Sequence, residues 1–338
     1  MKAASALVAL CITIGFWPAS GQAQTLERIK ARGKIICGAS QGVPGFSLPD
    51  ANGVWKGFDT DMCRALAAAI LNDPMKAEFM SLSAKDRFAP LQSGEVDVLT
   101  RTTTWTIARD SLFGLNFTAV NYYDGQGFMV PKKLGIEKPE QLAGGSVCAT
   151  QGTSNEMNLA DFFRSKELKF EPVVFATNDE VVGAYEAGRC DAISLDVSSL
   201  AAIRLKFRTP DEHVILPQLI SKEPLGSFVR AGDDQWFRIV RWTQFALLNA
   251  EELGVTKANV DKMVDSKVPD IRRLLGSEGN AGEGIGLSKD WVVRIIRAVG
   301  NYGESFERNL GSESPLKLAR GANNLWTKGG LQYAPPIR

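Results

Sequence analysis

The sequence contains very little histidine, and its cysteines do not form a Cys-x-x-Cys pair. His213 is the single histidine among 338 residues. Without a second histidine or a Cys/His cluster, neither a zinc site nor a serine or cysteine triad can be assembled in its usual form. We therefore expect no metal, no cofactor and no catalytic residue. His213 is expected to lie in a loop just before a strand at 214–216.

The sequence also has a net charge of only +1 and lacks, beyond its start, a long hydrophobic run. Lys2 precedes an apolar run at 3–17 and a small-residue segment that ends at Ala23, which is the order of a secretory signal peptide. The run is shorter than the roughly 20 residues of a membrane helix. We predict a cleaved signal peptide over 1–23 and an exported, soluble protein. The remaining 38 basic residues and 38 acidic ones form no basic stripe, which argues against a nucleic-acid partner.

Removal of residues 1–23 leaves an even number of cysteines. The four are Cys37, Cys63, Cys148 and Cys190. In an oxidising compartment, an even number outside metal-binding patterns favours disulfides. The first pair falls in the first half of the predicted fold and the second pair in the second half, so we predict the bridges Cys37–Cys63 and Cys148–Cys190.

Strand patterns alternate with helical patterns, which predicts an α/β fold with parallel sheets and right-handed crossovers. The predicted strands lie at 34–39, 77–82, 96–100, 127–130, 146–149, 172–176 and 192–195. The predicted helices lie at 59–71, 84–92, 154–164 and 179–186. About 315 residues after cleavage is long for one hydrophobic core, so two domains are expected.

One sequence pattern occurs twice. In SGEVDVLTRT and in AGRCDAISLD a helix ends at a glycine, and Asp97 or Asp191 then opens an apolar strand that ends in hydroxyls and charges. The repetition indicates two lobes of similar architecture. Turn-forming residues at 121–127 and 221–226 predict a hinge of two crossing strands.

The two crossings divide the chain into a discontinuous lobe 1, at 24–124 and 225–338, and a lobe 2 at 125–224. Apolar residues after Asp233 and at 288–299 have helical spacing. We expect both helices to pack on lobe 1, with Ser288 as the N-cap of the second.

Ligands of such sheets bind beyond the carboxyl ends of the strands. In lobe 1 this position holds Arg101, Thr102, Thr104 and Arg109. Because a guanidinium forms two parallel hydrogen bonds with a carboxylate, we predict that Arg109 holds a ligand carboxylate, with the threonine hydroxyls beside it. The alternative is a surface ion pair between Arg109 and Asp110.

In lobe 2 the equivalent strand ends at Asp196, which we expect to bind a ligand ammonium group. The alternative role for Asp196 is the N-cap of the following helix. Thr153 and Ser154 follow a glycine at a predicted helix start, where free amides can bind an anion, so they are candidates to share the ligand carboxylate. Alternatively, they form an ordinary N-cap. Together with Arg109, these residues would bind a small zwitterion between the lobes.

The sequence resembles the periplasmic substrate-binding proteins of general L-amino acid ABC transporters, within bacterial extracellular solute-binding protein family 3. The similar segments are LTRTTTWTIARD, YYDGQGFMV, DDQWFRIVRW, VGNYGESFERN and GGLQYAPPIR, and the resemblance runs from about Lys34 to Arg338. It implies a two-lobed type II periplasmic-binding-protein fold with mixed sheets. It also implies a periplasmic receptor that delivers free L-amino acids to a membrane permease, and we expect a monomer.

The resemblance assigns the ligand carboxylate to Arg109, hydroxyl contacts to Thr102, Thr104, Thr153 and Ser154, and the ammonium to Asp196. Many relatives place an aromatic ring over the ligand after the first strand, where this chain has Gly42-Val-Pro-Gly45. Phe46 or Trp55 would have to replace that ring. Arg101 predicts a preference for acidic or amide side chains.

Two other functions remain open from the sequence. An enzyme resembling cyclohexadienyl dehydratase can share this fold, but it needs a positioned acid. Asp196 is a candidate acid, although no other carboxylate is expected near it. A sensory binding protein that presents its ligand to a chemoreceptor is the second alternative.

Overall fold

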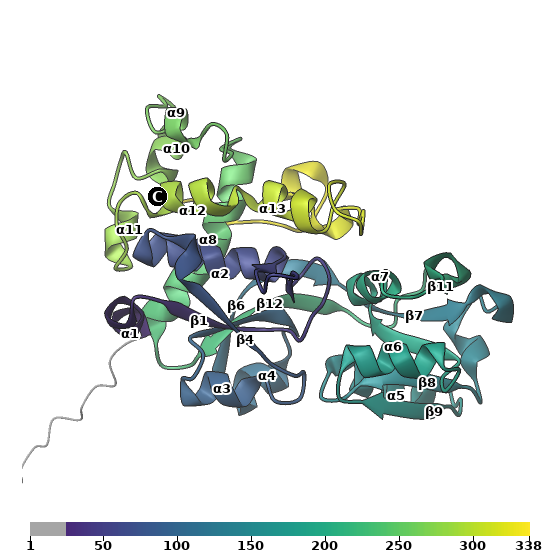
Figure 1. The fold of residues 1–338 in the computed structure, drawn as a ribbon. Helices are drawn as coiled ribbons and strands as arrows, with labels where there is room; N and C mark the ends of the chain where they lie inside the picture. Colours follow the sequence, from purple (N-terminus) through teal and green to yellow (C-terminus); the bar gives the residue numbers. More distant parts are fainter. Residues whose placement is uncertain (1–24) are drawn as a thin grey trace, which may run out of the picture.

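A computed structural model describes residues 25–338, so the predicted signal peptide lies outside the described residues. The chain forms two bodies, each built on a five-stranded sheet, which lie on the left and right of Figure 1. The first sheet has the order β4 (Ala77–Ser81), β1 (Ile35–Ala39), β5 (Val98–Thr104), β12 (Glu223–Arg230) and β6 (Leu115–Asp124). The second has the order β11 (His213–Ile215), β7 (Gln126–Pro131), β10 (Ala192–Asp196), β8 (Ser146–Thr150) and β9 (Glu171–Phe175). We call these bodies lobe 1 and lobe 2, while the exact limits given above stay a prediction.

The repeated sequence pattern forms the same local structure in both lobes. The backbone N–H of Asp97 donates to the carbonyl of Ile36, and its Oδ2 accepts from the N–H of the same residue at 2.8 Å. Asp191 has the same two bonds with Ser146, also with 2.8 Å to Oδ2. Each aspartate therefore fixes the start of a central strand to the strand beside it, which explains why the residue precedes β5 and β10.

The segments that cross between the lobes are longer strands than the sequence pattern indicates. β6 and β12 pair in antiparallel register through Asp124 and Glu223. β7 pairs antiparallel with β10, whereas β8 pairs parallel with both of its neighbours. Both sheets are therefore mixed, as the resemblance implies, with the antiparallel pairs contributed by the crossing strands. The chain passes into lobe 2 at Gly125 and returns before Glu223.

Helices cover both faces of each sheet, so the parallel strands are buried on both sides, as such strands require. In lobe 1 they are α1 (Thr25–Arg32), α2 (Phe58–Leu71), α3 (Phe88–Ser93) and α4 (Ile107–Leu112). In lobe 2 they are α5 (Ser154–Ser165), α6 (Asn178–Glu186) and α7 (Val197–Arg204). The predicted helix at 84–92 begins four residues late, because residues 84–87 form a turn that contributes to the space between the lobes.

Further helices from the C-terminal third pack on lobe 1, as the apolar spacing predicts. They are α8 (Asp234–Glu252), α9 (Val260–Met263), α10 (Pro269–Leu274), α11 (Ala281–Gly284), α12 (Trp291–Val299) and α13 (Tyr302–Asn309), drawn green to yellow in Figure 1. Short 3-10 turns occur at Pro74–Lys76, Lys132–Leu134, Pro139–Leu142, Pro210–Glu212, Gly321–Asn323 and Trp326–Lys328, and a two-stranded ribbon joins β2 (Leu48–Pro49) to β3 (Trp55–Lys56).

The predicted N-cap of α12 is wrong. Asp290 occupies the N-cap position, and Ser288 lies one turn earlier, where its carbonyl accepts from the N–H of Trp291. The Ser288 hydroxyl has no partner within residues 25–338. Asp290 makes no capping bond with its side chain either; residues 289 and 290 form a turn, and α12 begins directly after it.

The C-terminal segment is also bonded to the strand that leads into the hinge. The hydroxyl of Tyr302 and the side-chain amide of Gln332 both donate to the carbonyl of Asn121, at 2.8 and 3.1 Å. Asn323 forms two bonds with the backbone of Tyr123. These contacts hold the end of β6 against the C-terminal segment, which also belongs to lobe 1.

Both predicted disulfides are confirmed. Cys37 at the centre of β1 bonds to Cys63 in α2, and Cys148 in β8 bonds to Cys190 just before β10. Each bridge joins elements of one lobe. Within residues 25–338, no helix combines the length and apolar character that a membrane-crossing segment requires.

Loss of either disulfide should lower the free energy of unfolding. The bridges close loops with sequence separations of 26 and 42 residues, and restricting loops of that size in the unfolded chain contributes about 3–4 kcal/mol each. We expect Cys37→Ala/Cys63→Ala and Cys148→Ala/Cys190→Ala each to lose stability of this order, measured by urea unfolding beside the wild type. A loss below about 1 kcal/mol in either double variant would contradict this account.

Candidate functional site

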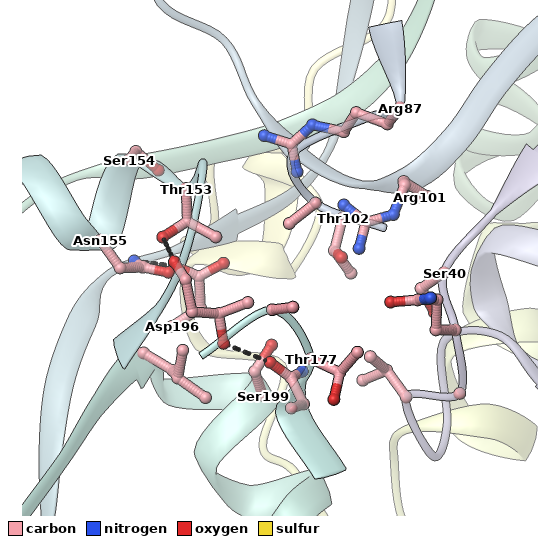
Figure 2. Close-up of a pocket in the computed structure, with 18 of the residues that line it drawn as sticks. Ser40, Arg87, Arg101, Thr102, Thr153, Ser154, Asn155, Thr177, Asp196 and Ser199 are labelled. Atoms are coloured by element: carbon pink, nitrogen blue, oxygen red, sulfur yellow. Dashed lines mark hydrogen bonds between the residues drawn. The ribbon is translucent and has the colours of Figure 1, made fainter. Parts of the chain in front are cut away.

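A cavity lies between the lobes, at the carboxyl ends of β1, β5, β8 and β10. About 680 Å³ between the lining residues is not filled by atoms, a figure that includes space open to solvent. Figure 2 shows Arg87, Arg101, Thr102 and Ser40 from lobe 1 facing residues of lobe 2 that include Asp196. The lining residues are Ser40, Gln41, Gly42, Val43, Ala84, Arg87, Arg101, Thr102, Thr104, Thr150, Thr153, Ser154, Asn155, Ala176, Thr177, Asn178, Asp179, Leu195, Asp196 and Ser199.

Thr102 lies on the lobe 1 wall in a strained conformation. Its φ of 27° falls in the left-handed region, which a β-branched residue rarely adopts. The N–H of Thr102 donates to Oδ2 of Asp59 at 2.9 Å, and Asp59 is almost fully buried at the start of α2. Such strain costs on the order of 1–3 kcal/mol and persists only where the surroundings enforce it. Asp59 supplies that constraint.

Burial raises the pKa of Asp59 to about 6, and the bond from Thr102 offsets part of the shift. The positive charge of the Arg101 guanidinium also lowers the pKa of Asp59. Asp59 is therefore a buried carboxylate that supports the wall of the cavity without lining it.

Three arginines of lobe 1 lie at this wall. Arg87 and Arg101 line the cavity, whereas Arg109 lies behind Thr104 and donates from Nη1 to the carbonyl of Thr104 at 2.7 Å. All three are buried, with exposed fractions of 3%, 8% and 6%. The alternative of a surface ion pair between Arg109 and Asp110 is wrong, because Arg109 is buried and Asp110 accepts instead from the N–H of Phe117.

The arginines are incompletely paired within the described part of the chain. The buried Nε atoms of Arg87 and Arg101 have no hydrogen-bond partner there. Burial lowers the pKa of Arg101 to about 10, and burial with repulsion from Arg109 and Arg101 lowers the pKa of Arg87. An anion placed between these buried guanidinium groups would form charge-assisted hydrogen bonds with them and stabilise their positive charge. Arg87 was missed in the sequence because it precedes a short helix rather than following a strand.

The lobe 2 wall carries the opposite charge. Asp196 is buried, and its Oδ1 accepts from Nδ2 of Asn155 at 2.7 Å. It stands at the N-cap position of α7 but makes no capping bond with its side chain, so the capping role is wrong. Burial, followed by repulsion from Asp124 and Glu223, raises the pKa of Asp196 well above its usual range.

Asp196 therefore belongs to a group of carboxylates, contrary to the expectation that no other acid lies near it. Asp124 ends β6, and desolvation raises its pKa to about 6, with repulsion from Glu223 as a smaller cause. Glu223 begins β12 beside it. Because both residues lie on the crossing strands, the acidic group lies where the lobes join.

Glu223 also connects the two lobes through hydroxyl groups. Its Oε2 accepts from Thr104 of lobe 1 at 2.6 Å and from Ser154 of lobe 2 at 2.8 Å, and these two hydroxyl oxygens lie 3.1 Å apart. Thr153 acts as the N-cap of α5 and accepts from the N–H of Glu156, so the capping alternative holds for Thr153. The structure thus brings Thr102, Thr104, Thr153, Ser154 and Asp196 to one cavity. Glu223 had no sequence signal beyond its place before a crossing strand.

The expected aromatic replacement is wrong. Phe46 is buried against Tyr122 with ring centroids 5.5 Å apart, and Trp55 stacks on Phe79 at 5.6 Å. Within residues 25–338, none of the residues that line the cavity is aromatic. The walls near Ser40 and Thr177 are polar or small instead.

Residues 35–261 match the bacterial extracellular solute-binding proteins, family 3, and the chain belongs to this family. The α9–α13 region falls largely beyond the matched residues. The family consists of binding proteins, and the close relatives are named as transporter components, so the chain is a binding protein and not an enzyme.

The relatives match nearly the whole chain. The general L-amino acid-binding periplasmic protein AapJ of Rhizobium johnstonii is 54% identical, over 99% of this chain and 98% of that protein. The glutamate/glutamine/aspartate/asparagine-binding protein BztA of Rhodobacter capsulatus is 51% identical, over 94% and 95%. A solved structure of an ABC transporter periplasmic binding protein from Brucella ovis with glutathione bound is 56% identical, has a TM-score of 0.92, and covers 94% of this chain and 100% of that one.

Substitution of Asp59 by asparagine should change how stability depends on pH. The pKa of Asp59 is raised to about 6 from its ordinary value of 3.8, so the folded protein holds this proton more tightly than the unfolded chain. The wild type should therefore gain about 1.4 kcal/mol relative to Asp59→Asn between about pH 7.5 and about pH 5. Urea unfolding at both pH values measures the difference. A difference that stays constant with pH would show that Asp59 does not titrate in this range.

Proposed function

We propose that this protein is a periplasmic receptor that binds free L-amino acids, favours polar, acidic or amide side chains, and delivers them to an ABC permease. The observation that carries the proposal is the pair of buried, oppositely charged walls that face each other across one cavity. A free amino acid is a zwitterion with its two charges on one carbon, so it can pair with both walls at once. The names of the relatives support the same ligand class.

The ligand carboxylate binds at the lobe 1 wall. Thr102 and Thr104 offer hydroxyls there, Arg101 faces the cavity, and Arg109 adds its charge from behind Thr104. The bond to the Thr104 carbonyl fixes the orientation of the Arg109 guanidinium before the ligand arrives. Ser154 approaches the same point from lobe 2. Charge-assisted hydrogen bonds of this kind are roughly twice as strong as neutral ones.

The ligand ammonium binds at Asp196. The repulsion among Asp196, Asp124 and Glu223 makes the empty site unfavourable for a negative charge on Asp196. An ammonium group relieves that repulsion and is favoured over a neutral group. The cavity therefore favours amino acids, which bring an ammonium group to Asp196, over simple carboxylic acids, which have none.

The ligand side chain points toward the remaining donors. Arg87 and Arg101 supply more positive charge than one α-carboxylate requires, and no aromatic ring among the lining residues competes for that wall. A second carboxylate or an amide oxygen fits these donors. This choice agrees with the acidic and amide ligands named for BztA.

Ligand capture favours closure of the lobes, since a ligand with contacts on both walls binds the closed state better than the open one. The closed receptor then docks on a membrane permease whose transport is driven by a separate ATPase. A sensory role differs only in the docking partner. The export signal predicted over 1–23 agrees with a periplasmic location.

Glutathione is a second candidate ligand, because the Brucella ovis protein was solved with it bound. Its γ-glutamyl end carries the same α-carboxylate and α-ammonium groups as a free amino acid. Ser40, Gly42 and Thr177 line the cavity with small side chains, so the barrier to a longer ligand near Gly42 is the bond that Lys206 makes there. The zwitterionic end would occupy the same anchors.

Calorimetry with a panel of L-amino acids tests the proposal directly. Arg109→Ala and Asp196→Ala should each weaken binding more than tenfold, because losing a charge-assisted partner costs roughly 1.5–3 kcal/mol. Arg272→Ala, an exposed arginine paired with Glu278 on the far side of lobe 1, is the matched control and should bind like the wild type. Affinities within a factor of three of wild type for both site variants, or prephenate turnover without amino-acid binding, would refute the proposal.

Arg87 should determine the preference between an acid and its amide. Arg87→Met keeps the apolar stem and removes the charge, so affinity for L-glutamate should fall at least tenfold more than affinity for L-glutamine. Competition binding with the two ligands measures the ratio. An unchanged ratio would assign the side-chain preference to another residue.

A further inference from the structure

The two lobes touch on both sides of the cavity. Near the hinge, Thr104 and Ser154 approach through their hydroxyls. Farther out, a Cβ added to Gly152 of lobe 2 would lie 2.7 Å from Cα of Lys85 in lobe 1. At the rim, Lys206 of lobe 2 bonds to Gly42 of lobe 1. The structure is therefore a closed form.

Lys206 joins the two walls at the end of the cavity away from the hinge. Its ammonium donates to the carbonyl of Gly42 at 3.1 Å and to Oδ1 of Asp179 at 2.7 Å. Gly42 and Asp179 both line the cavity, one from each lobe, whereas Lys206 itself does not. The side chain is 26% exposed, so it lies at the border between the cavity and solvent.

This position lies opposite the anchors for the charged groups. In Figure 2, Asp196 and Ser154 lie on the left, Ser40 lies on the right, and Thr177 lies between them. Gly42 and Asp179 follow Ser40 and Thr177 by two residues each. A ligand held by its zwitterionic end that extends past Arg101 toward Ser40 therefore reaches the bond between Lys206 and Gly42.

We propose that Lys206 selects ligands by length. The proposal rests on the proposed function, since it assumes that the amino-acid end binds at Asp196 and Arg109. A compact amino acid fits behind Lys206, and the bond to Gly42 then closes the cavity over it. A glutamine that carries a long group on its side-chain amide nitrogen reaches the rim and must displace the bond between Lys206 and Gly42. Lys206 thus stabilises the complex with a short ligand and opposes a long one.

Gly152 is needed for closure of the lobes but not for selection by length. A variant at this position therefore tests closure alone. Its φ of 73° favours glycine, and the backbone of Lys85 fills the place of a side chain. Any side chain there holds the lobes apart whatever the ligand. Gly144, also in lobe 2, has a φ of 79° and nothing within 4 Å, so it offers the same backbone conformation in open space.

The test compares L-glutamine with γ-L-glutamyl-p-nitroanilide, which carries the same amide with a long uncharged group. In Lys206→Met, glutamine should dissociate faster and bind at least threefold more weakly, while the affinity of the nitroanilide stays constant or rises. The ratio of the two affinities should shift at least threefold toward the long ligand. A smaller shift, or a shift toward glutamine, would overturn the proposal.

Three further variants identify the cause. Lys166→Met breaks an ion pair with Glu140 inside lobe 2 and should leave both affinities unchanged. Gly152→Ala should weaken both ligands at least fivefold and equally, whereas Gly144→Ala should bind both normally. A wild-type protein that binds neither ligand would refute the proposed function itself, while normal glutamine binding with an unchanged ratio in Lys206→Met would refute only length selection.

Discussion

The separation of buried charge between the two lobes is the constraint on which the site depends. Arg87, Arg101 and Arg109 lie on lobe 1, and Asp196 lies on lobe 2 with Asp124 and Glu223 behind it. Each group is costly to desolvate alone. The two sets can compensate each other fully only when the lobes close around a ligand that carries both charges, so binding energy and closure are linked.

The hinge and the site share residues, which strengthens that link. Glu223 begins a crossing strand and accepts hydrogen bonds from a hydroxyl of each lobe. Asp124 ends the other crossing strand and contributes to the raised pKa of Asp196. A change in charge at the ligand ammonium therefore changes the electrostatic interactions of the two strands about which the lobes move. The C-terminal helices hold the end of β6 through Asn121, so lobe 1 is the firmer side of the hinge.

Much of the architecture could be predicted because it follows from local patterns. Cys37, Cys63, Cys148 and Cys190 pair as expected, since each pair lies within one lobe. The failures have a common cause. Neighbouring residues in the chain predict an N-cap at Ser288, a helix at 84–92 and an aromatic role for Phe46 or Trp55. A turn before α12, a turn at the cavity and core packing decide these features instead.

The sequence by itself determined the α/β class, the repeated unit with its aspartates, the disulfides and the polar residues at the strand ends. Strand periodicity and cysteine spacing are local properties, so they can be seen without coordinates. Only the tertiary structure placed Arg87 and Glu223 in the site, moved Arg109 behind Thr104, and brought Lys206 to the rim. Those positions depend on how the two lobes approach each other, and that approach is fixed by contacts between residues distant in the sequence, such as Thr104 with Ser154 and Lys206 with Gly42.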